Sequence, residues 1–358
     1  MSLNARLAQT AHRIWRHKGW VSTLLLPLAW LSAAFVRRKT AQYQAHPERV
    51  FHSHLPVVVV GNIYVGGTGK TPVVMALVQA LQQRGWHPGV ISRGYGVAAT
   101  DHALVGSGQL NPLQFGDEPT LISRATLAPV AVHPRRVLAL QALQQAYPAV
   151  DVVIADDGLQ HLALGRDLEI VVQDGRGTGN GRLLPAGPLR EPAEKLRHVD
   201  FLISNLQADE TVTLPATTTP PHLIMRLQAV RAVNVVSGQV MAWADWLVDH
   251  RQDNISAVAA IGQPERFFAM LRAQGLFLAD AVALPDHYAY TSSPFPALNS
   301  TIVLITAKDA VKCADFADPR LWAVHVEPVF SDNTWLESVH QRLVAIAAAK
   351  ADIASPLR

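Results

Sequence analysis

Residues 57–71 read VVVVGNIYVGGTGKT, and this segment decides the fold class. Four consecutive valines are typical of a strand that is covered on both faces. A glycine-rich turn follows, and Pro72 then opens a helix that we predict over residues 72–83. Glycines let successive backbone N–H groups point toward an anion, and the helix adds the positive end of its dipole. The segment therefore predicts a site for nucleotide phosphates at the end of a buried strand.

The predicted phosphate loop consists of Gly66, Gly67, Thr68, Gly69, Lys70 and Thr71. Lys70 is expected to reach the β- and γ-phosphates, and the Thr71 hydroxyl is expected to ligate Mg²⁺. The general pattern G-x-x-x-x-G-K-[ST] begins with glycine, whereas this chain has Tyr64 there. The loop is therefore imperfect, but its strand and helix context argue against a chance glycine turn.

Strand-like and helix-like segments alternate on the C-terminal side of this loop, which predicts a parallel sheet with helices on both faces. We predict strands at residues 89–91, 127–132, 150–155, 168–173 and 201–204, and a helix at 136–145. A second set has strands at 257–261, 277–282, 301–305 and 321–326, a helix that begins at 262–265, and another at 336–351. The expected fold is α/β, with a P-loop NTPase-like parallel-sheet domain (53–221) and a second, smaller α/β domain (242–358). Residues 222–241 form a two-stranded linker in which 222–230 is expected to pair with 232–241.

The N-terminal segment, residues 1–52, contains a long apolar run with basic flanks. It lacks the alternation of strands and helices that the rest of the chain shows. Charged residues make up only 16% of the chain, against about 25% in an average soluble protein. An uncharged run from Trp20 to Val36 lies between basic residues and is followed directly by Arg37, Arg38 and Lys39. This pattern predicts a membrane-associated helix, and both a spanning helix and one in the headgroup layer are compatible with it.

Composition excludes other classes of site. The formal net charge is only +3, and no long basic tract contains interleaved aromatic residues, which argues against nucleic-acid binding. The single cysteine, Cys313, excludes an internal disulfide and a cysteine-based zinc site. No feature of the sequence indicates an obligate protein partner.

A metal-binding carboxylate is expected at the end of a buried strand. Asp156 and Asp157 directly follow the predicted strand 150–155, and either could hold Mg²⁺ directly or through water. Paired acids at a strand end can also cap a helix, but the phosphate loop already requires a metal partner. His161 follows closely, and a lone histidine is often only structural.

Other polar residues stand at predicted turns from strand to helix. Taken singly, each is compatible with turn or capping chemistry. Together, at the rim of the phosphate loop, they become candidates for substrate, base and metal groups. They are Ser92, Arg93 and Tyr95 in one turn, Asp117 in Gly-Asp-Glu-Pro, Arg190 and Glu191 in a Pro/Gly-rich loop, and His287 in Asp-His-Tyr.

The order of these motifs is more specific than any one of them. Gly-Gly-Thr-Gly-Lys-Thr, Ser-Arg-Gly-Tyr-Gly, Gly-Asp-Glu-Pro, Asp-Asp-Gly-Leu-Gln-His, Leu-Pro-Ala-Gly-Pro-Leu-Arg-Glu-Pro, Asp-His-Tyr and Thr-Ala-Lys-Asp-Ala-Val-Lys-Cys follow one another. This set closely resembles the tetraacyldisaccharide 4′-kinase (lipid A 4′-kinase) family, from the apolar N-terminus to about Cys313. The resemblance implies transfer of the ATP γ-phosphate to the 4′-hydroxyl of a tetraacylated glucosamine disaccharide 1-phosphate, the lipid A disaccharide precursor. It also implies Mg²⁺ and a position on the cytoplasmic face of the bacterial inner membrane.

The resemblance also implies roles for individual residues. Asp117 would activate the sugar hydroxyl, paired with His287, and Arg190 matches an active-site position. Because phosphoryl transfer needs charge neutralisation, we expect Lys70 and Arg190 to absorb charge on the transferred phosphoryl group. Asp156, Asp157 and Glu191 match the metal-linked acids of the family. Ser92, Tyr95 and His161 match other active-site positions. Leu159 and Ala307 depart from residues that the family often has, Phe and Glu, but neither is expected to carry chemistry.

Three rival classes fit less well. Switch ATPases of the membrane-partitioning type have a Lys directly before the glycine pair, where this chain has Val65. Regulatory GTPases read their base with Asn-Lys-x-Asp, and Thr306–Asp309 does not match that pattern. A kinase with a soluble acceptor would leave the apolar N-terminus unexplained.

Overall fold

The computed structural model describes residues 11, 13–94, 101–211 and 220–354 of the chain. Its first unit is built around the valine strand, whose side chains point alternately to the two faces of the sheet. The strands of this unit are β1 (Val57–Gly61), β2 (Pro88–Ser92), β3 (Leu104–Gly106), β4 (Val130–Val132), β5 (Val152–Asp156), β6 (Leu168–Asp174), β7 (Phe201–Asn205) and β8 (His222–Asn234).

Helices cover both faces of the first unit, as the buried valine strand requires. Val58 and Val60 belong to one core with side chains of α4 (Lys70–Gln82), α6 (Asp117–Thr126) and α11 (Thr334–Ala354). Val57 and Val59 belong to the opposite core, with α7 (Arg136–Ala146). Short helical segments elsewhere in this unit are η1 (Pro47–Arg49), α5 (Pro112–Phe115) and η2 (Ala193–Arg197).

The second unit repeats the same architecture on a smaller scale. Phe267, Phe268 and Leu271 of one helix pack on one face of its sheet, while the aromatic side chain of Phe295 packs on the other. Its elements are β9 (Val240–Ala242), α8 (Trp243–His250), β10 (Ile255–Ala259), α9 (Pro264–Ala273), β11 (Leu278–Ala283), η3 (Phe295–Ala297), β12 (Ile302–Thr306), α10 (Ala307–Cys313), η4 (Ala314–Phe316) and β13 (Leu321–Phe330).

The two units share one sheet of thirteen strands in the part of the chain that the structure describes. Its order is β11-β10-β12-β13-β8-β7-β6-β1-β5-β2-β4-β3, and β9 pairs with β8. Most neighbours are parallel, whereas β3 with β4, β8 with β9 and β8 with β13 are antiparallel. The α/β prediction is confirmed, with a mixed and mostly parallel sheet in place of a wholly parallel one.

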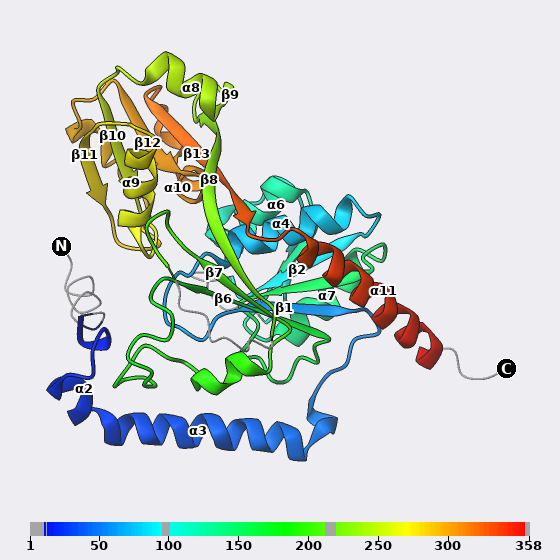
Figure 1. The fold of residues 1–358 in the computed structure, drawn as a ribbon. Helices are drawn as coiled ribbons and strands as arrows, with labels where there is room; N and C mark the ends of the chain where they lie inside the picture. Colours follow the sequence, from blue (N-terminus) through cyan, green and yellow to red (C-terminus); the bar gives the residue numbers. More distant parts are fainter. Residues whose placement is uncertain (1–10, 12, 95–100, 212–219, 355–358) are drawn as a thin grey trace.

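A ribbon of two long strands, β8 and β13, connects the units (Figure 1). The predicted pairing of 222–230 with 232–241 is wrong, because β8 continues unbroken to Asn234, its residues 222–225 pair with β7, and its residues 225–234 pair with β13. Only residues 231–233 pair with the short β9, across a turn at 235–239. After β13 the chain returns to the first unit, where Trp335, Val339 and Leu343 of α11 enter its core.

The apolar N-terminal run forms two helices, α2 (Trp20–Leu24) and α3 (Leu26–Ala45). The division falls at Leu25 because Pro27 lies in the first turn of α3, where its missing N–H costs least. Helix α3 runs along the outside of the first unit (Figure 1). Among the described residues, no helix is both long and apolar enough to cross a membrane.

Candidate active site

A cleft of about 770 Å³ lies between the two units. The loop after β1, the first turn of α6 and the ends of β5, β6 and β7 line it from the first unit. The turns that follow β10, β11 and β12 line it from the second unit. Because strands of a parallel sheet end at the same edge, both units direct their loops into this cleft.

The glycine-rich loop joins β1 to α4 and is held by hydrogen bonds from both sides. Gly66 and Gly69 have φ angles of 99° and 92°, in the left-handed region that favours glycine. Asn62 Nδ2 donates to the Gly66 carbonyl at 3.1 Å, and Asn205 Nδ2 donates to the Thr68 carbonyl at 3.2 Å. Helix α4 begins at Lys70, two residues before the predicted start. The loop is thus rigid, and it lies at a helix N-terminus.

Tyr64, the departure from the general loop pattern, has a structural explanation. Its ring is buried, and the Arg176 guanidinium lies 4.2 Å from the ring centroid. Arg176 Nη2 also donates to the Gly67 carbonyl at 3.0 Å and lies 2.6 Å from Asp174 Oδ2. Gln263 of the second unit donates to the same carbonyl at 3.0 Å. A cation held over an aromatic face therefore braces the loop, and sequence reasoning missed this.

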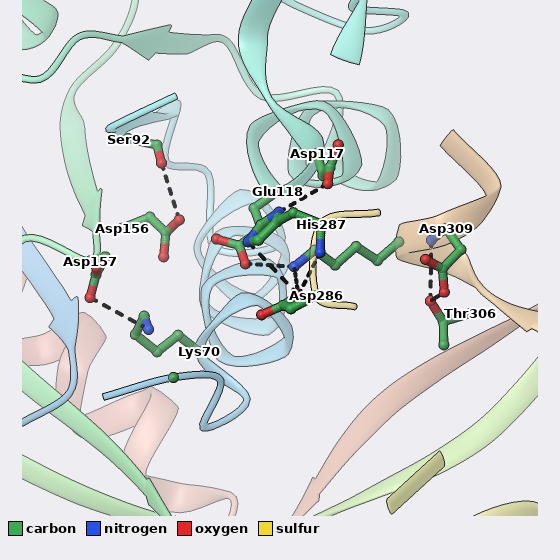
Figure 2. Close-up of polar contacts among 12 residues, drawn as sticks. Lys70, Ser92, Asp117, Glu118, Asp156, Asp157, Asp286, His287, Thr306 and Asp309 are labelled. Atoms are coloured by element: carbon green, nitrogen blue, oxygen red, sulfur yellow. Dashed lines mark hydrogen bonds and ion pairs between the residues drawn. The ribbon is translucent and has the colours of Figure 1, made fainter. Parts of the chain in front are cut away.

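Asp157 is held by two cations. Lys70 Nζ lies 3.4 Å from Asp157 Oδ1, and Arg190 Nη2 lies 3.0 Å from the same oxygen. Burial alone would raise the pKa of Asp157, but Lys70 and Arg190 outweigh it, so its pKa lies far below the usual range. Figure 2 shows the Lys70–Asp157 pair beside the loop. Asp157 is therefore ionised and fixes the head group of Lys70.

Asp156 has the opposite environment, although it is the next residue. It is buried at the end of β5, and Ser92 Oγ donates to its Oδ2 at 3.2 Å. Oδ1 has no hydrogen-bond partner among the described residues. Burial and the nearby negative charge of Glu118 raise the pKa of Asp156 to about 7. A buried carboxylate oxygen without a donor is suited to receive a cation.

The structure brings Asp117 and His287 together across the cleft (Figure 2). Asp117 is the first residue of α6, and its Oδ2 lies 3.1 Å from His287 Nδ1. Burial alone would raise the pKa of Asp117, but hydrogen bonds from His287 and Lys312 outweigh it, and the pKa is lowered. An ionised carboxylate thus lines the same cleft as the glycine-rich loop.

Two lysines of α10 form ion pairs with acids on this side of the cleft, and sequence reasoning assigned them no role. Lys308 Nζ lies 3.1 Å from Glu118 Oε1 and 3.5 Å from Asp286 Oδ1. Lys312 Nζ lies 2.8 Å from Asp117 Oδ2. Their spacing of four residues in Thr306–Cys313 was the available signal, because it places both on one face of a helix.

The other predicted site residues differ in whether they reach the cleft. Arg93 lines the cleft and is exposed. His161 and Glu191 are not among the residues that line it. Gln160 Nε2 donates to Glu191 Oε1 at 2.5 Å, and burial raises the pKa of Glu191. Burial and Arg136 lower the pKa of His161 to about 4, so its ring is neutral. Tyr95 lies outside the described residues.

A rigid glycine-rich loop with a fixed lysine, facing an ionised carboxylate–histidine pair across a cleft, defines an α/β enzyme of the phosphotransferase class. Residues 21–344 match the family described as Tetraacyldisaccharide-1-P 4′-kinase. A tetraacyldisaccharide 4′-kinase from Bordetella petrii is 52% identical over 352 residues, which cover 98% of this chain and 99% of that protein. One from Herminiimonas arsenicoxydans is 43% identical, over 92% of this chain and 94% of that protein.

The fold is also similar to that of a solved structure. LpxK from Aquifex aeolicus, crystallised in complex with ATP, superimposes with a TM-score of 0.76 at 26% identity. The match covers 91% of this chain and 99% of that one. The chain belongs to the tetraacyldisaccharide-1-phosphate 4′-kinase family. The resemblance inferred from the ordered motifs is confirmed.

Proposed function

We propose that this enzyme transfers the γ-phosphate of ATP to the 4′-hydroxyl of a tetraacylated glucosamine disaccharide 1-phosphate in lipid A biosynthesis. The observation that carries the proposal is the Asp117–His287 pair, which faces the glycine-rich loop from across the cleft. The names of the relatives support the choice of acceptor, and the ATP complex of the Aquifex aeolicus enzyme supports the choice of donor.

The donor is expected to bind as in P-loop proteins. Backbone N–H groups of Gly66–Thr71 and the N-terminus of α4 would receive the phosphates, and Lys70 would neutralise charge on the β- and γ-oxygens. Arg190 and Lys70 both form ion pairs with Asp157, so the two cations lie at the same end of the loop. Their shared carboxylate holds them in place before the nucleotide arrives, which lowers the entropy lost on binding.

The residues at the loop fit a bound Mg²⁺. Oδ1 of Asp156, which has no hydrogen-bond partner in the part of the chain that the structure describes, and the Thr71 hydroxyl, which also lines the cleft, are oxygen ligands of the kind that this ion prefers. Burial raises the pKa of Asp156, and a bound cation would favour its ionised form. Asp157 is already paired with two cations, and Glu191 with Gln160, so Asp156 is the better candidate for direct contact. When bound, Mg²⁺ would neutralise charge on the phosphate oxygens.

The transfer itself depends on positioning and charge neutralisation. The 4′-oxygen forms a bond to the γ-phosphorus while the bond to the β-phosphate oxygen breaks, and that electron pair leaves with ADP. The hydroxyl proton passes to Asp117, late in the transfer because the transition state is loose. His287 hydrogen-bonds the same carboxylate and keeps it oriented. Lys70 and Arg190 would absorb the charge on the transferred oxygens.

We further propose that the enzyme lies on the cytoplasmic face of the bacterial inner membrane. One side of α2 and α3 docks on the first unit: the Ser22 hydroxyl donates to the Ala186 carbonyl at 2.5 Å, and Lys39 Nζ donates to the Gln160 carbonyl at 3.1 Å. The other side exposes large apolar side chains. They are Trp20, Leu24, Leu28, Trp30, Leu31 and Phe35. Aromatic rings beside Arg37 and Arg38 suit the interface of an anionic leaflet, where acyl chains of the acceptor would also lie.

The test is a transfer assay with γ-labelled ATP and Mg²⁺. The acceptors are the tetraacylated disaccharide 1-phosphate and, in parallel, a glucosamine-only acceptor without acyl chains. We expect label on the disaccharide alone. Transfer to the soluble acceptor at a similar kcat/KM, or hydrolysis of ATP without transfer, would refute the proposed acceptor.

A further inference from the structure

Helix α10 of the second unit carries two lysines that reach consecutive acids of the first unit. Lys312 meets Asp117, and Lys308 meets Glu118, at nitrogen–oxygen distances of 2.8 Å and 3.1 Å. Both acids lie in the first turn of α6. The Lys312 and Asp117 side chains are each only 10% exposed, so this ion pair is shielded from water and salt. The pair therefore differs from an ordinary surface salt bridge, which contributes little.

Lys312 is itself fixed by its surroundings. Its Nζ donates to the Tyr288 carbonyl at 2.7 Å and lies 5.7 Å from the Tyr290 ring centroid. The start of α10 is anchored by Asp309, which accepts from Thr306 Oγ1 at 2.6 Å and from the Ala260 N–H at 3.2 Å. Figure 2 shows Thr306 and Asp309 together at this anchor. The ammonium group is thus held at one place in the second unit.

The contacts of Lys312 also determine which oxygen of Asp117 is available. Lys312 and His287 both reach Oδ2, and no donor among the described residues reaches Oδ1. Two donors thus hold the carboxylate through the same oxygen, Oδ2. His287 has a left-handed φ of 57°, which surrounding contacts must hold. Lys312 supplies one of these contacts, because its Nζ donates to the carbonyl of Tyr288, the residue that follows His287.

We propose that Lys312 is a positioning residue for phosphoryl transfer, which orients the Asp117 carboxylate and the loop that carries His287 when the two units meet. The inference rests on the proposed function and deepens it. Asp117 belongs to the first unit and Lys312 to the second, so the base is complete only when α10 contacts α6. In a loose transition state the hydroxyl proton leaves late, and orientation of the carboxylate matters more than its basicity.

The groups around Asp117 agree with this role. Lys308 and Lys312 face it from α10, His287 and Asp286 from the loop after β11, and Glu118 from its own helix. Burial would raise the pKa of the Asp117 carboxyl, but the hydrogen bond from His287, together with Lys312 and Lys308, lowers it. Loss of Lys312 is therefore expected to move the acidic limb of the kcat profile to higher pH.

The experiment compares Lys312→Met and Lys312→Arg in the full-length enzyme, with Arg272→Met as the matched control. Arg272 is an exposed cation of α9, on the same unit. We expect Lys312→Met to lower kcat by about 10- to 100-fold, because a misplaced catalytic group loses this much. KM for ATP should stay within about twofold, since Lys312 does not contact the loop. Lys312→Arg should recover part of kcat, and the control should match wild type.

A double-mutant cycle separates positioning from mere stability. If Lys312 acts through Asp117, Lys312→Met should lower kcat no further in an Asp117→Asn background. An equal loss in both backgrounds, or a wild-type kcat with an unshifted pH profile in Lys312→Met, would overturn the role. If Lys312→Met does not fold, Lys312→Gln, which keeps a donor for the Tyr288 carbonyl, replaces it in every comparison. Wild-type enzyme that does not phosphorylate the disaccharide would instead refute the proposed function.

Discussion

Asp117→Asn is the most direct test of the proposed chemistry. The substitution keeps the shape of the side chain and one oxygen that can accept from Lys312 or His287, but it removes the charge and the proton acceptor. Loss of a general base typically costs about 10²- to 10⁴-fold in rate. At about 1.4 kcal/mol per tenfold change, the activation barrier should rise by roughly 3–5 kcal/mol.

The structure predicts that this loss falls on kcat. Within the described part of the chain, the contacts of Asp117 go to His287 and Lys312, and none goes to the glycine-rich loop. Affinity for ATP should therefore remain within about twofold of wild type. The fold should lose about 1–3 kcal/mol, because the buried ammonium of Lys312 keeps a neutral acceptor in place of a charged one.

The assay measures kcat and KM for ATP at saturating acceptor, with ATP binding followed by calorimetry and stability by urea unfolding. Asp249→Asn, on the exposed side of α8, is the matched control and should behave as wild type. A kcat within threefold of wild type across the pH range would refute the assignment of Asp117 as the base. Equal losses of kcat and ATP affinity would indicate instead that the loop had been disturbed.

Three further outcomes are expected. Tyr64→Ala should weaken ATP binding several-fold in calorimetry, because Arg176 loses a cation–π contact of about 0.5–2 kcal/mol, whereas Tyr64→Phe keeps the ring and should bind normally. Burial and the charges of Arg231 and Arg124 lower the pKa of His325 to about 4. His325 therefore binds its proton first in the unfolded chain as pH falls below about 6.5, and its own contribution to stability should drop by at most about 1.4 kcal/mol per pH unit down to about pH 4, in addition to that of His161. His325→Gln should flatten that slope in urea unfolding, and an unchanged slope would count against a neutral His325. Leu24→Ser with Phe35→Ser should reduce sedimentation with anionic vesicles about tenfold or more, since both side chains are exposed, and equal sedimentation would argue against the proposed membrane face.

Much of the first unit followed from local pattern. The valine run, the glycine turn and the helix after it lie where they were expected, because each depends on residues a few positions apart. Errors occurred where a partner distant in sequence decided the outcome. Residues 222–234 are extended, as predicted, but their main partner is β13, nearly a hundred residues later. Extended segments with similar composition are compatible with several partners, and packing of the two units selects one.

For the candidate site too, sequence pattern identified some features, and others depended on contacts between distant residues. Sequence pattern identified Lys70, Asp117, Asp157 and His287 as residues with suitable chemistry. It gave no account of Arg176 above Tyr64, since no spacing rule links a loop to the end of a strand more than a hundred residues away. It also could not distinguish Asp156 from Asp157. The pKa of one is raised and that of the other is lowered by burial and by neighbours that only the folded chain provides.

By itself, the sequence determined a strand, a phosphate loop and a helix, because backbone conformation there depends on adjacent glycines, valines and proline. It also determined which residue types could perform phosphoryl transfer. Only the tertiary structure decided how they act together: His287 and Lys312 lie 170 and 195 residues from Asp117 along the chain, yet share one of its oxygens. Side-chain contacts between two packed units depend on how the whole sheet folds, and so a local pattern does not contain them.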